Sequence, residues 1–206
     1  MSQLQAGAWS SVATARIGVV GGYSFLLLGL TDSMLGVAWP TIRQAFSEPL
    51  TALSLLLVAS ALGYVATAAP SGYLLNRFGA VSILAVASLT AGFACALVAA
   101  ALDLWMLAAA ALLLGAASGS VDAGLNTVVA NGGPLRLLNA IHGAYGVGTV
   151  FGPILVTLAI VWASFWRLPY ATLPTSSALR RSSAGRQLRA LTHSAAGNYA
   201  PLQALT

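Results

Sequence analysis

The stretch from residue 115 to residue 153 reads GAASGSVDAGLNTVVANGGPLRLLNAIHGAYGVGTVFGP, two apolar segments separated by a polar break at residues 131–134. Asp122 lies inside the first segment, and a charged side chain at a bilayer centre costs about 2.5–3.5 kcal/mol even on translocon-based scales. Asn126 follows four residues later, so a helix places the amide and the carboxylate on one face. We expect that face to line a protein interior and not to contact lipid.

The composition is that of an integral membrane protein. Of the 206 residues, 58% are apolar and 6% are charged, against about 25% charged residues in soluble domains, and the mean hydropathy is +0.85. All nine basic residues are Arg, and five of them lie in the last forty positions, so the net charge of +5 does not indicate a nucleic-acid partner. The chain has a single cysteine and lacks a phosphate loop, a metal-spaced His or Cys set and a catalytic triad, so we expect neither an enzyme nor a metal or cofactor.

Five apolar runs predict an all-α membrane protein with five transmembrane helices. Each run has about the 20 apolar residues that are needed to cross the hydrocarbon core, and the runs cover residues 17–39, 53–75, 81–102, 104–130 and about 142–162. Residues 40–52 are predicted to form a polar connection. Four tryptophans at the outer ends of spans are expected to anchor the protein at the membrane interface: Trp39, Trp105, Trp162 and Trp166.

The arginines predict the orientation. Arg16, Arg77 and Arg136 fall on one side of the five spans, whereas Arg43 falls on the other, together with both remaining loop acids. The positive-inside rule therefore places the N-terminus in the cytoplasm. We expect a multi-pass protein of the bacterial inner (plasma) membrane.

The chain divides into three parts. Residues 1–15 form a cytoplasmic N-terminal segment, residues 16–164 a transmembrane bundle, and residues 165–206 an Arg-rich polar tail that is expected to be disordered. The tail mixes Ser, Ala and Arg and has no run long enough to span a membrane. Its abrupt change of composition leads to the hypothesis that it is a terminal fragment or a frame-shifted product.

A short internal similarity links the first and fourth predicted spans. Each places an aspartate three residues after a glycine, in Gly29-Leu-Thr-Asp32 and in Gly119-Ser-Val-Asp122. Inverted repeats of three spans build binding sites at the membrane midplane in secondary transporters. Chance similarity is the alternative at this length.

Residues 72–79, GYLLNRFG, resemble the loop signature of the major facilitator superfamily, in which a Gly is followed four residues later by Asp-Arg and then Gly. Asn76 stands in place of the usual Asp, and Ala80 and Val81 replace basic residues. By this resemblance, a conformational loop is formed by Gly72, Asn76, Arg77 and Gly79.

Within that superfamily, residues 16–164 are most similar to the fucose-permease type of sugar/proton symporter. The similarity rests on an acid late in the first span (Asp32), on an acid with an Asn four residues later (Asp122 and Asn126), and on the Arg136-Leu-Leu-Asn139 sequence before the fifth. It implies most of one six-helix half of a twelve-span transporter. Such a protein would move a small polar solute, for example a sugar, coupled to protons by alternating access.

The same resemblance makes Asp32, Asp122 and Asn126 candidates for substrate contact and proton coupling. The alternative for each acid is a hydrogen bond to a neighbouring helix. His142 is a candidate proton relay, because imidazole titrates near physiological pH, but a packed or interfacial histidine is the simpler interpretation, since the sequence shows no partner for it. The expected partners are the lipid bilayer, a small-molecule solute, protons, and a missing second half or a second copy of the chain.

Two other functions remain open. The chain could be a non-transporting membrane protein that acts as an interaction partner or is inactive. Residues 148–153, GTVFGP, also resemble the fifth-span signature of drug/proton antiporters, which would make the protein an efflux transporter. The simpler interpretation of small residues spaced by four, as in Gly18/Gly22, Gly115/Gly119 and Gly148/Gly152, is close helix packing.

Overall fold

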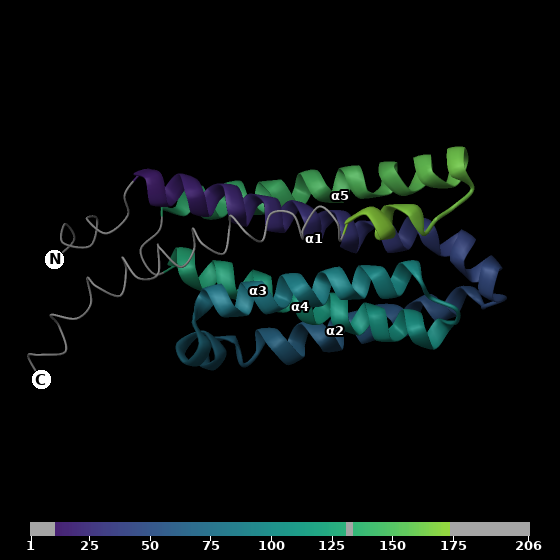
Figure 1. The fold of residues 1–206 in the computed structure, drawn as a ribbon, viewed down its shortest axis with the longest axis horizontal. Coiled ribbons are helices and arrows are strands. Elements are labelled where there is room, and N and C mark those ends of the chain that lie inside the picture. The colour runs from purple at the N-terminus through teal and green to yellow at the C-terminus, as the bar shows by residue number, and fades with distance from the viewer. Residues whose placement is uncertain (1–10, 131–133, 174–206) are drawn as a thin grey trace, which may run out of the picture.

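A computed structural model describes residues 11–130 and 134–173, and the described part is helical (Figure 1). Five helices in it are long and apolar enough to cross a membrane. This confirms the predicted all-α membrane protein with five spans. The elements are α1 (Ser11–Phe46), a 3-10 turn η1 (Leu50–Ala52), α2 (Leu53–Ala68), α3 (Ser71–Ala99), α4 (Leu104–Ala130) and α5 (Leu135–Ala163).

The predicted division into three parts stays a prediction. Residues 1–10 and 174–206, which include most of the predicted N-terminal segment and tail, lie outside the described residues.

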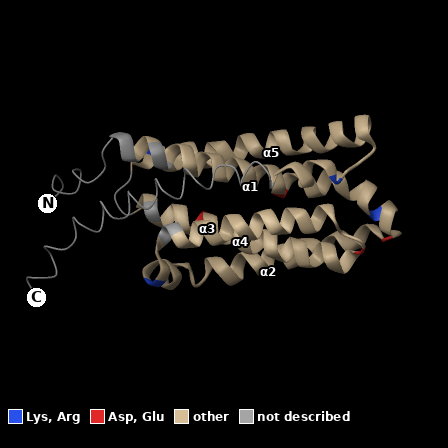
Figure 2. Cartoon of the chain, viewed as in Figure 1, with Lys and Arg blue, Asp and Glu red and all other residues tan. Residues whose placement is uncertain are grey.

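The helices form two groups that lie side by side. The helix α1 packs along α5, and α4 packs along both α2 and α3, while α1 and α4 touch over a shorter stretch. The bundle has an end that holds Arg77 and Arg136 and an opposite end that holds Arg43, Glu48 and Asp103. We call these the Arg77 end and the Arg43 end. Figure 2 shows that charged residues gather at both ends, whereas the long middle of the bundle contains few.

Close backbone contact holds the α1–α5 pair together. A Cβ atom added at Gly148 would overlap the carbonyl of Leu26, and one added at Gly152 would overlap the hydroxyl of Ser33. Small residues let helix backbones approach to this distance. The expectation of close packing is confirmed for these two glycines.

Close backbone contact at glycines also holds the α2–α4 pair together. A Cβ at Gly63 of α2 would overlap the carbonyl of Leu112, and one at Gly115 of α4 would overlap the carbonyl of Ser60. Because each glycine faces backbone and not a movable side chain, neither position has room for a larger residue. The glycines therefore set how closely the walls of the bundle approach one another.

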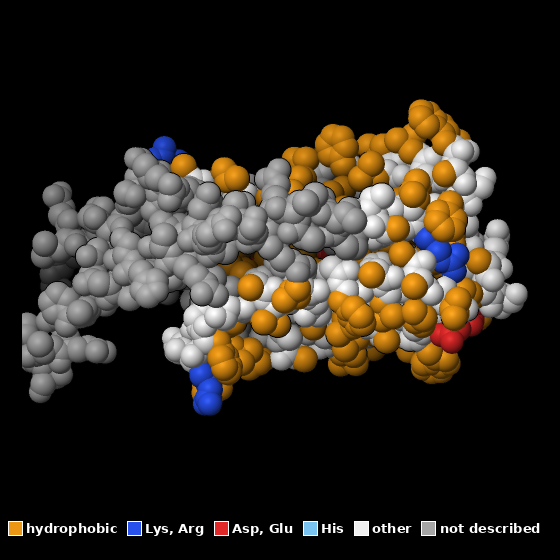
Figure 3. Space-filling model, in the orientation of Figure 1, with side chains coloured by type: hydrophobic (Ala, Val, Ile, Leu, Met, Phe, Trp, Pro, Cys, Tyr) orange, Lys and Arg blue, Asp and Glu red, His pale blue; other side chains and the backbone are white. Residues whose placement is uncertain are grey.

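The apolar core consists of two clusters at different depths. The cluster toward the Arg43 end includes Trp39, Leu56 and Val156, and the cluster toward the Arg77 end includes Leu125 and Ile141. Polar side chains of α1 and α4 lie along the bundle between and beside these clusters. Figure 3 shows hydrophobic side chains spread along the visible face, as expected for a surface that contacts lipid.

Two predicted boundaries around the first connection and the second span are wrong. The helix α1 continues through Pro40 to Phe46 instead of ending at residue 39, because the added turns bury Ile42 completely in the core. The helix α2 ends at Ala68, not at residue 75, since Pro70 lacks the amide hydrogen that would continue the helical hydrogen bonds. Gly79, at φ 75°, then interrupts α3 at the last residue of the predicted conformational loop.

The fifth span also begins earlier than predicted. The helix α5 starts at Leu135, directly after Pro134, and not near residue 142. The additional turns bury Leu137 and Ile141 against the cluster at the Arg77 end. At the other end of the bundle, the Asp103 carboxylate accepts a hydrogen bond of 2.8 Å from the Met106 amide and so caps the start of α4.

The tryptophans divide into two pairs. Trp105 and Trp162 are 72% and 82% exposed, which suits the predicted interfacial anchors, but Trp39 and Trp166 are 1% and 3% exposed. The prediction is wrong for these two because the segments that follow α1 and α5 fold back onto the bundle. The Trp39 indole donates to the carbonyl of Leu50 at 3.3 Å, and Trp166 lies beside Phe46 with ring centroids 6.3 Å apart.

Candidate functional site

Asp122 lies on α4 with both carboxylate oxygens engaged. The hydroxyl of Tyr64 donates to Oδ2 at 2.5 Å, and the amide of Asn126 donates to Oδ1 at 2.8 Å. The contact with Asn126 was expected from the spacing of four. Tyr64 comes from α2, 58 positions away in the chain, and no local pattern in the sequence pointed to it.

Neighbouring residues hold Tyr64 in this position. The hydroxyl of Thr67 donates to the carbonyl of Ala116 at 2.8 Å and so ties α2 to α4 one turn away. A Cβ atom at Gly119 would overlap the carbonyl of Tyr64. Gly119 is therefore part of the site, since only its missing side chain lets the tyrosine approach the carboxylate.

Asp32 has a corresponding partner on α5. The hydroxyl of Tyr145 donates to its Oδ2 at 3.3 Å, across 113 positions of sequence. A Cβ atom at Gly29 would overlap the carbonyl of Tyr145. As at Asp122, a glycine three residues before the acid brings the tyrosine of a neighbouring helix close to it.

These contacts form two equivalent units. In each, a glycine packs against the backbone of a tyrosine whose hydroxyl donates to an aspartate three residues after that glycine. We call them Gly-Tyr-Asp units, and they consist of Gly29, Tyr145 and Asp32 and of Gly119, Tyr64 and Asp122. The helix pairs α1/α5 and α4/α2 run in opposite directions, the arrangement expected for an inverted repeat.

A cavity of about 410 Å³ lies between α1, α2 and α4. Asp32 and Tyr64 both line it, so the two Gly-Tyr-Asp units meet there. Its remaining walls are Leu, Val, Ala and Gly side chains and backbone, and its polar lining residues are Thr31, Asp32, Ser60, Tyr64, Ser118 and Tyr170. Such a combination, mostly apolar with a few polar groups, is typical of small-molecule sites.

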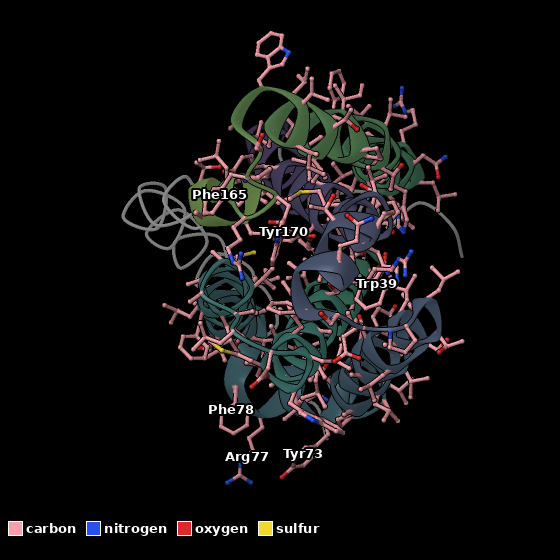
Figure 4. All side chains as sticks on the ribbon, turned by 90° about the vertical axis from the view of Figure 1, so that its right-hand side faces the viewer. Trp39, Tyr73, Arg77, Phe78, Phe165 and Tyr170 are labelled. Atoms are coloured by element: carbon pink, nitrogen blue, oxygen red, sulfur yellow. The ribbon has the colours of Figure 1, made fainter. Side chains whose placement is uncertain are left out.

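Tyr170 lines the same cavity from the segment that follows α5. It is 1% exposed, and its hydroxyl has no hydrogen-bond partner among the described residues. Burial raises the pKa of this hydroxyl. In Figure 4, which views the bundle from the Arg43 end, Tyr170 lies toward the inside of the bundle and Phe165 nearer its edge. Sequence reasoning missed Tyr170, because it lies in the part of the chain that composition marks as a polar tail.

His142 contacts neither acid among the described residues. Its Nδ1 lies 2.9 Å from the carbonyl of Leu138 in its own helix, and its ring meets that of Phe25 edge-on at 5.1 Å. It is three positions before Tyr145 on α5. The described contacts therefore do not connect His142 to Asp32, and its role as a proton relay stays a prediction.

The residues of the predicted conformational loop lie at the Arg77 end, away from the cavity, and they form the first turns of α3 up to the break at Gly79 instead of a loop. The Arg77 guanidinium donates to the hydroxyl of Tyr73 at 3.0 Å and lies 5.6 Å from the ring centroid of Phe78. Figure 4 shows these three side chains pointing away from the bundle. Gly72 and Asn76 are also exposed. Within the described residues, no group of three His, Cys, Asp or Glu could hold a metal ion.

One comparison with known proteins identifies a family. A family model described as Major Facilitator Superfamily matches residues 22–179, more than half of the chain, and the matched region contains both Gly-Tyr-Asp units. No curated protein matches the sequence.

Proposed function

The chain belongs to the major facilitator superfamily, a family of membrane transporters and not of enzymes, and on this premise we propose that it moves a small solute coupled to protons. In this proposal Asp32 contacts solute or proton in the cavity, and Asp122 and Asn126 act beside it, through the hydrogen bond of Asp122 to the cavity residue Tyr64. The observation that carries the proposal is the pair of Gly-Tyr-Asp units, because they place two carboxylates within apolar spans, each held by a hydroxyl of another helix. Carboxylates at this depth are rarely retained without a function.

The two acids have different roles in this proposal. Asp122 accepts hydrogen bonds from both Tyr64 and Asn126, so its carboxylate is held in one position. Asp32 has the longer contact with Tyr145 and lines the cavity. A carboxylate with fewer partners is the better candidate for exchanging a proton or a solute. Asp122 then positions Tyr64 at the wall of the same cavity.

Alternating access requires that the described bundle rock against a second one. We propose that a second transporter half or a second copy of this chain supplies it, that the N-terminus is cytoplasmic, and that the membrane is a bacterial inner membrane. The loop containing Gly72, Asn76, Arg77 and Gly79 would face the cytoplasm and limit this motion. The resemblance to fucose permeases puts monosaccharides first among the solutes to be tested.

The test is proton flux in vesicles. The purified full chain is reconstituted with a pH-sensitive dye inside, a pH gradient is imposed, and solutes are added in turn. Solute-dependent proton movement is expected for the natural chain and for Glu48→Gln, a control that removes a carboxylate outside the cavity. Asp32→Asn and Asp122→Asn should abolish it.

Unchanged flux in either variant would remove that residue from the mechanism. Absence of flux from a correctly inserted natural chain, with every solute tried, would favour the non-transporting membrane protein. The direction of solute movement relative to the proton gradient separates import from efflux.

A further inference from the structure

The cavity between α1, α2 and α4 combines a single carboxylate with walls that are mostly apolar. We propose that it binds an amphipathic organic cation, whose charge pairs with Asp32 and whose apolar body lies against the Leu and Val side chains. This substrate class rests on the transport function proposed above and replaces the monosaccharide that the sequence favours.

The charge of the cavity is uncompensated. No Arg, Lys or His is among the described residues that line it, and the arginines whose side chains the structure describes lie at the two ends of the bundle. The Asp32 side chain is exposed and lines the cavity, so a ligand can reach its carboxylate. Asp32 has one described hydrogen bond, from Tyr145 at 3.3 Å. A cation would complete its environment, and an anionic solute would be repelled.

Two of the six polar lining residues already use their hydroxyl hydrogens, which leaves fewer donors for a sugar. The Thr31 hydroxyl already donates to the carbonyl of Leu27 at 3.0 Å, and the Tyr64 hydroxyl donates to Asp122. A monosaccharide carries several hydroxyls, and each one that leaves water without a new partner weakens binding. An organic cation with one charged centre and an apolar body needs fewer hydrogen-bond partners, and the burial of its apolar surface favours binding.

Two tyrosines add to this preference. Tyr64 and Tyr170 line the cavity, and the face of a tyrosine ring attracts a nearby cation. Tyr170 itself is almost fully buried, so Tyr64 is the more accessible of the two rings. A carboxylate, aromatic rings and apolar walls in one cavity are thus complementary to a cation of mixed character.

Equilibrium binding tests this inference without any gradient. The purified full chain in detergent is dialysed against tetraphenylphosphonium, and separately against tetraphenylborate, an anion of nearly the same size and shape, with protein-free micelles as the blank. The natural chain is expected to prefer the cation by about tenfold or more. Asp32→Asn should lose that preference, whereas Asp32→Glu and the control Glu48→Gln should keep it.

A second variant tests the inference independently, in case Asp32→Asn does not fold. Ala61 lines the cavity and is exposed, so Ala61→Phe can fill the space without entering the packed core. It should weaken cation binding while circular dichroism shows unchanged helix content. Equal binding of cation and anion by the natural chain, unchanged cation binding in Asp32→Asn or Ala61→Phe, or displacement of the cation by a monosaccharide would each overturn the inference. Proton-coupled flux of a solute without cation binding would overturn the substrate class alone and leave the transport function standing.

Discussion

Tyr64 of α2 donates its hydroxyl hydrogen to Asp122 of α4 across 2.5 Å, and the two residues are 58 positions apart. The same relationship recurs between Tyr145 of α5 and Asp32 of α1. In both, a glycine three residues before the aspartate removes the side chain that would otherwise keep the tyrosine away. The similarity between the first and fourth spans is therefore matched by equivalent contacts in space, which argues against chance.

The two Gly-Tyr-Asp units make two helix pairs of the bundle equivalent. The pair α1/α5 and the pair α4/α2 are equivalent, and the two pairs run in opposite directions, as the helices of an inverted repeat do. The units differ in detail, because Asp122 has Asn126 as a second donor and Asp32 lines the cavity instead. The proposal that the two acids have different roles rests on this difference.

The glycine contacts predict a contrast between two positions of α5. Gly148→Ala should destabilise the bundle by about 1–3 kcal/mol, because the new methyl group would overlap the Leu26 carbonyl and has no room to relax. Gly143→Ala is the matched control, since nothing lies within 4 Å of its added Cβ. It should leave stability unchanged or raise it by up to about 1 kcal/mol, because alanine favours helix. Thermal unfolding in detergent measures both, and equal effects would refute the close contact.

The tyrosine hydroxyls predict a second contrast. Tyr64→Phe should lower the free energy of unfolding by about 1 kcal/mol, because hydrogen bonds to charged groups contribute to stability and Asp122 would lose one of its two donors. Tyr73→Phe removes a hydroxyl from an exposed position and should have little effect. Denaturation in mixed micelles compares the two. A Tyr64→Phe variant as stable as the natural chain would show that the hydroxyl contributes nothing.

Arg167 is predicted to hold the Arg43 end together. Its guanidinium donates to the Ala101 carbonyl at 2.7 Å and lies 4.3 Å from the ring centroid of Trp166, so it ties the segment after α5 to the turn between α3 and α4. Arg167→Ala should increase the rate of maleimide labelling of buried Cys95 by about tenfold, the effect of losing roughly 1.4 kcal/mol. Arg136→Ala, at the other end, should not change it. Equal labelling rates in the natural chain and Arg167→Ala would contradict this role.

The orientation can be tested with two exposed positions at opposite ends. In a Cys95→Ser background, Leu102→Cys lies at the Arg43 end and Leu135→Cys at the Arg77 end, and both side chains are strongly exposed. If the N-terminus is cytoplasmic, a membrane-impermeant maleimide added to intact cells should label position 102 and not position 135. The reverse pattern would place the N-terminus outside, and labelling of both would show a mixed topology.

Several features of this protein could be predicted from its sequence. Hydropathy is a local property that adds up along the chain, so five runs of about 20 apolar residues are enough to predict five spans. The contact between Asp122 and Asn126 also follows from local geometry, because residues four apart share a helix face. The likeness to the major facilitator superfamily was carried by short motifs, and the family match over residues 22–179 confirms it.

Helix ends were less predictable, because burial at a helix end competes with local preference. Ile42 and Leu137 are buried by turns that their polar neighbours disfavour, and these contacts extend α1 and α5 beyond the apolar runs. Trp39 and Trp166 became core residues for a related reason. Whether an aromatic side chain anchors at the interface or packs inside depends on where the following segment folds.

The sequence by itself determined the membrane class, the number of spans and the two acids inside them, since each depends on the chain near one position. Only the tertiary structure decided which groups meet those acids. Along the chain, Tyr64, Tyr145 and Tyr170 look like ordinary aromatic residues. Helix packing brings Tyr64 to Asp122 and Tyr145 to Asp32, and it places Tyr170 at the cavity wall. The physical reason is that contacts across helices depend on the separation and rotation of whole helices, which glycines such as Gly29 and Gly119 fix by close contact with the backbone of a neighbouring helix.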